Sequence, residues 1–427
     1  MNILSHSIAL KPTPEQEEYF MKACGTSRMV WNWAVAEWDR LYAIGERTSG
    51  MSLSKQFNAV KYQLFPWLKD MHRDSHSQPF IYLQTTYQRF FNDIKKGYRI
   101  APDCKKQRKA LHEQGIKLAY KPRFKKKGQC VDSFYVANDK IKLNDKIVTL
   151  PRLGKVLMTE SLRFAGKIMG AVVKRKGLHW FLVVKVDVPD EVFFCKRKRH
   201  DVIGVDLGIK DLAICSNGEV IPASRPLKQS LRRLKIRSRD LSRKLTAAKE
   251  SLGIAKNKPI PKGTKLPVSN NRNKAQRRLT AIHERIANKR KDVADKLTTM
   301  LCRENQTVVM EDLNVKGMVK NRKLAQAIHD VGFGMIKRMM EYKAKRYRTK
   351  LIFADQWYPS SKLCSSCGVK NNELTLSDRS WTCSSCGSEH DRDLNAALNL
   401  LLLATESPCG DKTALPVANI LVTEYTT

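Results

Sequence analysis

The chain has 427 residues, too many for a single compact core of usual size, so we expect two or three domains. Its 79 lysine and arginine residues outnumber 41 acidic residues and give a formal net charge of +38, which favours a polyanion such as nucleic acid as the partner. The first residues, MNILSHSIAL, lack the basic segment and apolar run of a signal peptide, and no later stretch is apolar enough for a membrane helix, so we expect a cytoplasmic protein with no membrane partner.

The amino-terminal region predicts a short strand followed by helices. Residues 3–10 have the pattern of a strand, and Thr13, which lies between two prolines, predicts a helix start near Glu15. Aromatic residues are concentrated in RMVWNWAVAEW, residues 28–38, and in a second helical stretch around residues 82–91. We interpret most of these aromatic residues as helix packing, with stacking on nucleic-acid bases as the alternative.

A strongly basic segment precedes a β-rich one. Residues 105–127 contain ten basic residues and one acid, Glu113, and two aromatic residues and a proline interrupt the run. These interruptions favour phosphate contact at least as strongly as a plain solvated face. Residues 131–190 then change to alternating and β-branched residues, as in KIVTL and HWFLVVKVDV, which predicts a small β-rich domain that we interpret as a barrel.

The carboxyl-terminal half begins with an apolar strand and continues into basic helices. The strand VIGVDLG ends with Asp206 and a glycine, and KDLAIC is its predicted hairpin partner. Residues 225–250 carry ten basic and two acidic residues at helical spacing, and a loop near 259–267 separates them from a second helix. That helix has an apolar stripe at helical spacing, formed by Leu279, Ile282, Ile286, Val293, Leu297 and Leu301.

Three acidic residues lie where an apolar strand ends or a helix begins: Asp206 in GVDLG, Glu311 in VVMEDLN and Asp393 in DRDLNAALNL. Hydrolysis of a phosphodiester by two magnesium ions needs several carboxylate oxygens on a rigid sheet, because the ions lie about 3.5–4 Å apart. For each residue alone, a strand-end or helix-capping acid is the alternative. The chain order Asp, Glu, Asp, with a basic helical insertion after the first, favours a RuvC-type nuclease over a transposase with the order Asp, Asp, Glu.

Two neighbouring acids are alternatives for the second and third positions. Asp312 follows Glu311 directly, and Asp391 lies two residues before Asp393. We prefer Glu311 because of its phase in the strand and Asp393 because it adjoins LNAA, where a helix begins.

Four cysteines have the spacing of a metal site. Cys364 and Cys367 form one CSSCG motif, Cys383 and Cys386 form a second, and fifteen residues separate the two pairs. In a cytoplasmic chain this pattern predicts one structural zinc ion held by four thiolates, with a redox dithiol as the alternative. A closed four-thiolate site has no open position for catalysis, so we expect a scaffold.

The position of this zinc module, immediately before the third carboxylate, suggests that its folding orients Asp393. Two neighbouring residues have less specific interpretations. His390 is most simply a polar surface residue, with a ligand or catalytic role as the alternative. Arg392 is a candidate for contact with the scissile phosphate.

Several strings resemble, in the same order, those of TnpB proteins encoded by insertion sequences, a family similar to compact type V CRISPR effectors. They are LKPTPEQ, RMVWNWAVA, KPRFKKKG, GVDLGIKDLA, HERIANKRKDVADKL, VVMEDLNVKGM, YKAKRYRTKLIFADQWYPSSKLCSSCG, WTCSSCG and DRDLNAALN. The resemblance covers most of the chain, and every catalytic position is retained.

The resemblance implies an α/β multidomain protein. Its RuvC nuclease domain, of the ribonuclease H-like fold, has an inserted zinc ribbon and follows a β-barrel wedge domain that a helical recognition lobe interrupts. The implied bounds are residues 1–15 and 120–195 for the wedge, 16–119 for the recognition lobe, 196–363 and 391–404 for the RuvC domain, 364–390 for the zinc module that binds target nucleic acid, and 405–427 for a mobile tail.

The resemblance also implies an RNA-guided DNA endonuclease. Such an enzyme uses a transposon-derived guide RNA, recognises a short motif beside its target and cuts double-stranded DNA. The catalytic carboxylates, each a ligand of two magnesium ions, are then Asp206, Glu311 and Asp393, and the zinc ligands are the four cysteines. We expect a monomer near the prokaryotic nucleoid, with guide RNA and target DNA as partners. The alternative is a guided DNA-binding regulator or transposition accessory factor that does not cut.

Overall fold

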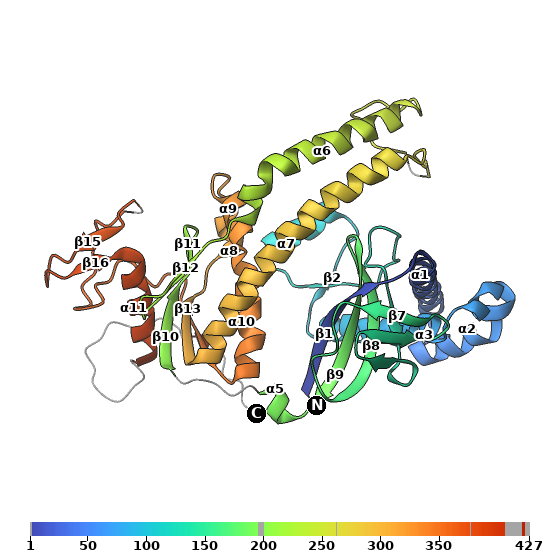
Figure 1. Ribbon diagram of the computed structural model, residues 1–427, viewed down its shortest axis with the longest axis horizontal. Coiled ribbons are helices and arrows are strands. Elements are labelled where there is room, and N and C mark those ends of the chain that lie inside the picture. Colours follow the sequence, from blue (N-terminus) through green and yellow to red (C-terminus); the bar gives the residue numbers. More distant parts are fainter. Residues whose placement is uncertain (1, 195–199, 262, 376, 406–420, 423–427) are drawn as a thin grey trace. The chain divides into compact units, whose positions relative to one another are not determined.

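The computed structural model describes residues 2–194, 200–261, 263–375, 377–405 and 421–422. The chain divides into two compact units, Met1–Phe193 and Phe194–Thr427, each with its own hydrophobic core (Figure 1). Within the described ranges, no helix combines the length and the apolar character that a membrane crossing requires. The tail predicted for residues 405–427 lies outside these ranges, apart from Thr405 and the two residues 421–422.

The first unit is built on a seven-stranded antiparallel sheet with the order β4-β8-β9-β1-β7-β6-β5. Alternate residues of its strands are buried, which confirms the predicted β-rich segment. The two edge strands are β4 and β5, and the closure of this sheet into a barrel stays a prediction. The strands are β1 (Asn2–Lys11), β4 (Ser133–Val136), β5 (Lys142–Asn144), β6 (Ile147–Leu150), β7 (Gly154–Met158), β8 (Lys167–Lys176) and β9 (His179–Val188).

Helices inserted after β1 pack around aromatic side chains. The first of them begins at Pro14, which confirms the predicted helix start, and Thr13 caps it in a capping box with Gln16. Trp38 and Tyr87 are buried and stack with their ring centroids 4.0 Å apart, so packing is the correct interpretation for this pair. The remaining elements of the unit are α1 (Pro14–Ala43), α2 (Gly50–Leu64), η1 (Pro66–Asp70), α3 (Asp74–Lys95), β2 (Arg99–Ile100), α4 (Lys105–Glu113), β3 (Leu118–Ala119), η2 (Asn138–Lys140) and α5 (Asp190–Phe193).

The second unit is built on a mixed sheet with the order β12-β11-β10-β13-β14-β17. Its three central strands run parallel, and β11 pairs antiparallel with β10, which confirms the predicted hairpin. The strands are β10 (His200–Asp206), β11 (Asp211–Cys215), β12 (Val220–Pro222), β13 (Asn305–Glu311), β14 (Lys350–Ala354) and β17 (Leu421–Val422).

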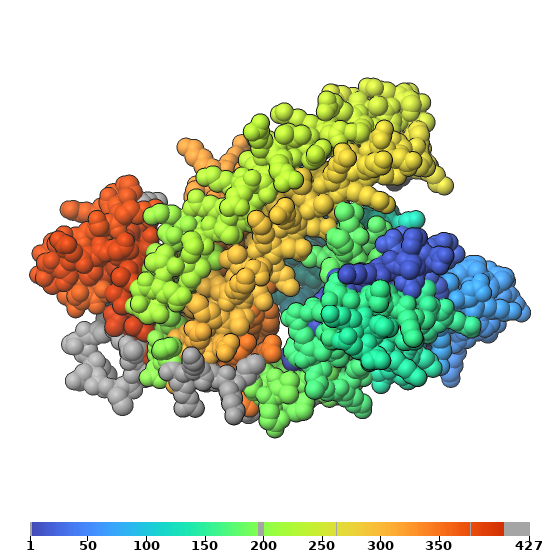
Figure 2. All heavy atoms as spheres, in the orientation of Figure 1, coloured from blue at the N-terminus to red at the C-terminus, as the bar shows by residue number. Residues whose placement is uncertain are grey.

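Two long helices, α6 (Pro226–Glu250) and α7 (Asn270–Glu304), form an antiparallel hairpin beside this sheet (Figure 1). Figure 2 shows them as one continuous ridge, in yellow-green and yellow. The predicted stripe on α7 is buried towards the sheet end, at Ile286, Leu297 and Leu301. The shorter helices are α8 (Val315–Met318), α9 (Ala325–Val331), α10 (Phe333–Tyr347) and α11 (Arg392–Thr405).

A buried aspartate anchors the start of α6. No side chain of its own segment caps this helix, and the carboxylate of Asp330 in α9 accepts hydrogen bonds from the backbone N–H groups of Leu227 and Lys228 at 2.9 and 3.0 Å. The Arg290 side chain of α7 donates to the same carboxylate at 3.2 Å. Because the first backbone N–H groups of a helix lack partners within it, this carboxylate both caps α6 and ties it to α7.

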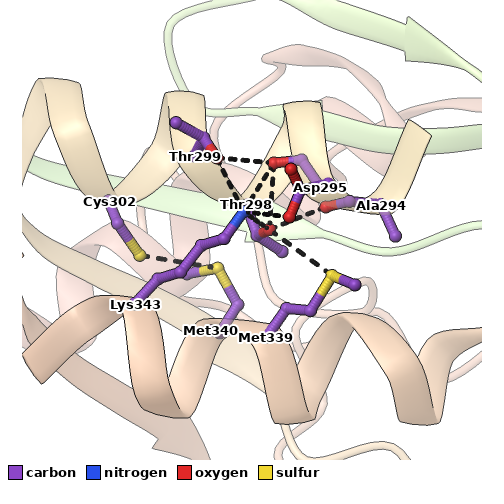
Figure 3. Close-up of polar contacts among 8 residues, drawn as sticks. All are labelled: Ala294, Asp295, Thr298, Thr299, Cys302, Met339, Met340 and Lys343. Atoms are coloured by element: carbon purple, nitrogen blue, oxygen red, sulfur yellow. Dashed lines mark hydrogen bonds and ion pairs between the residues drawn. The ribbon is translucent and has the colours of Figure 1, made fainter. Parts of the chain in front are cut away.

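A buried lysine joins α7 to α10 (Figure 3). The ammonium group of Lys343 donates to the hydroxyls of Thr298 and Thr299 at 2.9 and 2.6 Å and lies 2.9 Å from a carboxylate oxygen of Asp295. A buried ammonium group is costly unless it has hydrogen-bond partners, so these contacts hold the two helices together. Since α7 leads directly into β13, this contact stabilises the position of the strand that carries Glu311.

Helix α11 lies directly against β10. A Cβ atom added to Gly204 would lie 2.0 Å from the carbonyl oxygen of Ala397 and 2.6 Å from the backbone nitrogen of Leu401. Only glycine allows this approach of strand and helix. Between β14 and α11 the chain forms a small hairpin of β15 (Ser380–Thr382) and β16 (Glu389–Asp391) that carries two of the cysteines.

We expect Gly204→Ala to lower the free energy of unfolding by at least about 2 kcal/mol, because backbone atoms of α11 must move. The matched control is Gly334→Ala in α10, where an added Cβ has open space. That change should raise the free energy of unfolding by up to about 1 kcal/mol, since alanine favours helix. Denaturant unfolding of both variants measures the difference. Equal stabilities would contradict the close contact.

Candidate active site and metal centre

The three predicted carboxylates come together at one edge of the second sheet. Asp206 is the last residue of β10, and Glu311 is the last residue of the parallel neighbour β13. The carboxyl ends of parallel strands meet at the same edge, so these two side chains lie next to each other. Asp393 lies in the first turn of α11, which packs against β10.

The three carboxyl groups lie close enough to interact electrostatically. Burial, followed by the negative charges of Glu311 and Asp393, raises the pKa of Asp206 from 3.8 to about 7. The positive charge of Arg392 and a hydrogen bond from the backbone of Leu207 act in the opposite direction. A carboxyl group in such surroundings takes up a proton near neutral pH unless a cation replaces it.

The two neighbouring acids at the second position have different partners. The carboxylate of Asp312 accepts a hydrogen bond from the ammonium group of Lys337 in α10. Glu311 instead accepts a hydrogen bond from the hydroxyl of Ser360, a neutral group that orients the carboxylate without neutralising it. Asp312 is therefore already paired with a cation, whereas the hydrogen-bond partner of Glu311 is a neutral hydroxyl.

At the third position the two acids also differ. The Asp391 carboxylate accepts hydrogen bonds from the backbone N–H groups of Asp393 and Leu394 at 3.1 and 2.9 Å, so it caps α11. Asp393 is an ion-pair partner of Arg379, with 3.3 Å between the guanidinium nitrogen and the carboxylate oxygen. Arg392 donates to the backbone oxygen of Asp378 at 3.4 Å.

The four cysteines form a compact cluster. Their four Sγ atoms all lie within 4.8 Å of one another. Among the described residues, no other group of three or more metal-binding side chains is this compact. The oxygens of the three carboxylates, which repel one another, do not form such a group. The Sγ atoms of Cys364 and Cys386 are 3.6 Å apart, as are those of Cys367 and Cys383. Thiolates at about 2.3 Å from a tetrahedral zinc ion would lie roughly 3.8 Å apart, so this cluster could hold zinc.

Each cysteine pair lies in the same kind of turn. Gly368 and Gly387 follow the pairs with φ angles of +74° and +72°, a conformation that glycine adopts without strain. Their backbone N–H groups donate to the carbonyls of Cys364 and Cys383 at 2.8 and 2.9 Å. Hydrogen bonding with Ser388 lowers the pKa of Cys386, whereas desolvation and the other sulfurs of the cluster raise the pKa of Cys367.

Sequence reasoning missed the residues that connect this module to α11. The amide of Asn395 accepts from the backbone of Ser365 at 2.9 Å and donates to the carbonyl of Leu363 at 2.6 Å. Asn399, one turn later, donates to the carbonyls of Ser360 and Leu363 at 2.7 Å. Two asparagines four residues apart in the apolar run LNAALNLLLL were the available signal, because a buried amide requires partners.

The interpretation of His390 as a surface residue was wrong. Its ring is buried, packs on Trp381 across the hairpin, and places Nε2 3.0 Å from Sγ of Cys364. A neutral imidazole that donates to a thiolate orients that ligand without occupying a coordination position. The strand that contains His390 continues directly into the turn that holds Asp393.

We expect Cys383→Ser to lose bound zinc and to loosen the start of α11, because zinc binding is coupled to local folding. Metal analysis and limited proteolysis of the purified chain measure these effects. Cys104→Ser, which changes an exposed cysteine far from the cluster in sequence, serves as the control. A full zinc content in Cys383→Ser would contradict the ligand set.

We expect Asp206→Asn to stabilise the chain more at pH 8 than at pH 4 when no magnesium is added. The raised pKa means that the folded chain keeps a proton which the unfolded chain releases, so stability falls as pH rises from about 4 to about 7. An amide does not titrate, and the gain above pH 7 should be on the order of 2–4 kcal/mol. Denaturant unfolding at several pH values measures it. Asp292→Asn, a surface change, should show no such pH dependence.

Three family models match successive parts of the chain. A helix-turn-helix domain of insertion-sequence OrfB proteins matches residues 1–47, an OrfB model described as "Probable transposase" matches 182–322, and a Cas12f1-like TNB domain matches 333–400. The first of these segments contains one strand and a single long helix, β1 and α1, so here it is not a helix-turn-helix.

The chain is similar to a "Putative RNA-guided DNA endonuclease" of Streptomyces pristinaespiralis, with 42% identity over 49% of this chain and 47% of the relative. It therefore spans about half the length of that protein. A protein of Escherichia coli K12 with the same description and the name InsQ is 25% identical over 92% of this chain and 90% of its own length. Among solved structures, a Cas12f1–sgRNA–target DNA complex matches 91% of this chain and 83% of its own with 16% identity and a TM-score of 0.45. The three matches, in this order along the chain, and these relatives make the chain similar to OrfB proteins of insertion sequences and to proteins described as putative RNA-guided DNA endonucleases.

Proposed function

We propose that this chain is an RNA-guided DNA endonuclease that cuts double-stranded DNA, with Asp206, Glu311 and Asp393 as its catalytic residues. The observation that carries the proposal is the meeting of these carboxylates at one sheet edge, where burial and the charges of Glu311 and Asp393 raise the pKa of Asp206. Three carboxylates that destabilise one another in the absence of a cation are suited to bind hard divalent metal ions. The names of the two relatives support the same activity.

The proposed cofactors are two magnesium ions at the carboxylates and one structural zinc ion at the four cysteines. Magnesium at such a site would activate water and neutralise charge on the scissile phosphate. Asp206 and Glu311 would hold it from the rigid sheet, and Asp393 from the helix. The roles of Asp312 as a partner of Lys337 and of Asp391 as a helix cap support the choice of Glu311 and Asp393.

The surface charge supports nucleic acid as the partner. Helix α6 carries nine basic and two acidic residues, and Pro226 at its start is the one buried residue among its positions, all of which are described. Helix α4, within the predicted phosphate-binding segment, has no buried residue over its described length. Helices with so little apolar contact and so much positive charge are suited to phosphate binding, while base pairing with a guide RNA would supply sequence choice.

The finer organisation is part of the same proposal. Residues 1–15 and 120–195 would form a barrel-like wedge domain, 16–119 a recognition lobe, 196–363 with 391–404 the RuvC domain, and 364–390 the target-nucleic-acid-binding zinc module. The tail would be residues 405–427. A transposon-derived guide RNA, a short target-adjacent motif, a monomeric state and action at the prokaryotic nucleoid complete the assignment.

We expect Asp206→Ala to reduce cleavage by roughly a thousandfold or more while target binding persists, because alanine supplies no metal ligand. Guide pairing and phosphate contacts elsewhere should keep the target bound. The chain is co-expressed with the genomic DNA flanking its gene, the copurifying RNA is sequenced, and a matched DNA target is supplied with magnesium. Retention and cutting are measured together.

The control is Asp292→Ala, which removes a surface carboxylate of α7 paired with Lys296 and should cut as the wild type does. If the wild type retains the target but does not cut it with any of the divalent metals tested, the chain is a guided binding protein. If Asp206→Ala cuts as fast as the wild type, the active site lies elsewhere.

A further inference from the structure

One large aromatic side chain of the second unit lies almost fully in solvent. Trp357, in the loop that follows β14, is 81% exposed. The tryptophans Trp31, Trp38 and Trp180 are between 2% and 6% exposed, as expected for a side chain whose burial is strongly favourable.

The loop beneath this side chain is ordered by hydrogen bonds on both sides of it. The backbone N–H of Trp357 donates to the carboxylate of Asp355 at 2.8 Å, and that of Tyr358 donates to the carbonyl of Asp355 at 3.0 Å. The hydroxyl of Tyr358 also donates to the carbonyl of Asn399 in α11 at 3.3 Å. A loop held in this way presents the indole ring with little further loss of conformational entropy.

The same loop contacts the carboxylate site. Ser360, three residues after Trp357, donates its hydroxyl hydrogen to Glu311 and accepts a hydrogen bond from Asn399. Three residues span at most roughly 11 Å, so the backbone of Trp357 lies within that distance of Ser360, which contacts Glu311. The preceding residue, Gln356, is polar and exposed, which disfavours an apolar protein interface around the ring.

We infer that Trp357 stacks on an unpaired nucleobase next to the phosphodiester that the carboxylate site cuts. Every base has a flat π face, so an exposed indole binds nucleotides with little regard to sequence. A base offers that face only when it has left its own stack, so the strand at this site is locally unpaired. This inference rests on the proposed function, because it assigns a substrate contact to the same site.

The experiment uses the ribonucleoprotein purified with its copurifying RNA, a matched DNA target and magnesium. We expect Trp357→Ala to slow cutting by roughly 5- to 150-fold, the factor that stacking on one base contributes. Retention of the target should not change, because guide pairing holds it. Trp357→Tyr should restore most of the rate. The matched control is Tyr342→Ala, which removes a 53% exposed aromatic ring from α10.

A second measurement identifies the base. Single abasic nucleotides are placed in turn around the cleavage position of the target. At the stacked position the abasic nucleotide should slow the wild type by a similar factor and should not slow Trp357→Ala any further. At other positions both proteins should respond alike.

Two results would overturn the inference and leave the nuclease assignment intact. One is that Trp357→Ala cuts the target as fast as the wild type while Asp206→Ala is inactive. The other is a loss in Trp357→Ala that is the same for every abasic target, since the ring would then act on the protein itself. If the wild type does not cut at all, the proposed function fails, and the stacking contact fails with it.

Discussion

The close approach of helix α11 to strand β10 is the constraint on which the carboxylate site depends. Three negative charges repel one another, so each must be held by a different rigid element. The parallel strands β10 and β13 supply Asp206 and Glu311, and α11 supplies Asp393. Because Gly204 has no Cβ, the backbone of α11 can lie directly on β10 and bring the third carboxylate within electrostatic reach of the first.

The rest of the second unit stabilises this arrangement. The ammonium group of Lys343 joins α7, which leads into β13, to α10, which leads into β14. The four-cysteine segment contributes as well, since Asn395 and Asn399 bind its first cysteine turn and the preceding loop to α11. Burial and the negative charges of Glu311 and Asp393 both disfavour the charged form of Asp206 and raise its pKa, and these contacts keep the carboxylates from moving apart.

The large positive charge of the chain has an electrostatic cost. A net charge of +38 destabilises a compact chain through its own repulsion, and a bound polyanion removes that cost. Asp330 caps α6 and Arg290 ties it to α7, so the basic hairpin is fixed at its base by a few polar contacts. Its remaining length needs little apolar burial, because the basic side chains are solvated or bind phosphate.

The sequence by itself determined the elements and the chemistry of the side chains. Strand and helix periodicity predicted β1, the β10–β11 hairpin and α7, and the spacing of two CxxC motifs predicted the cysteine cluster, because these signals are local. Strand ends also pointed to Asp206 and Glu311, because an acid after an apolar run is visible in one dimension.

Only the tertiary structure decided which partner each of these side chains contacts. Asp312 pairs with a lysine 25 residues later, and the buried ring of His390 lies against a cysteine 26 residues earlier. In each case the outcome depends on contacts between residues distant in the chain, and the burial and electrostatic energies of such contacts have no counterpart in local periodicity.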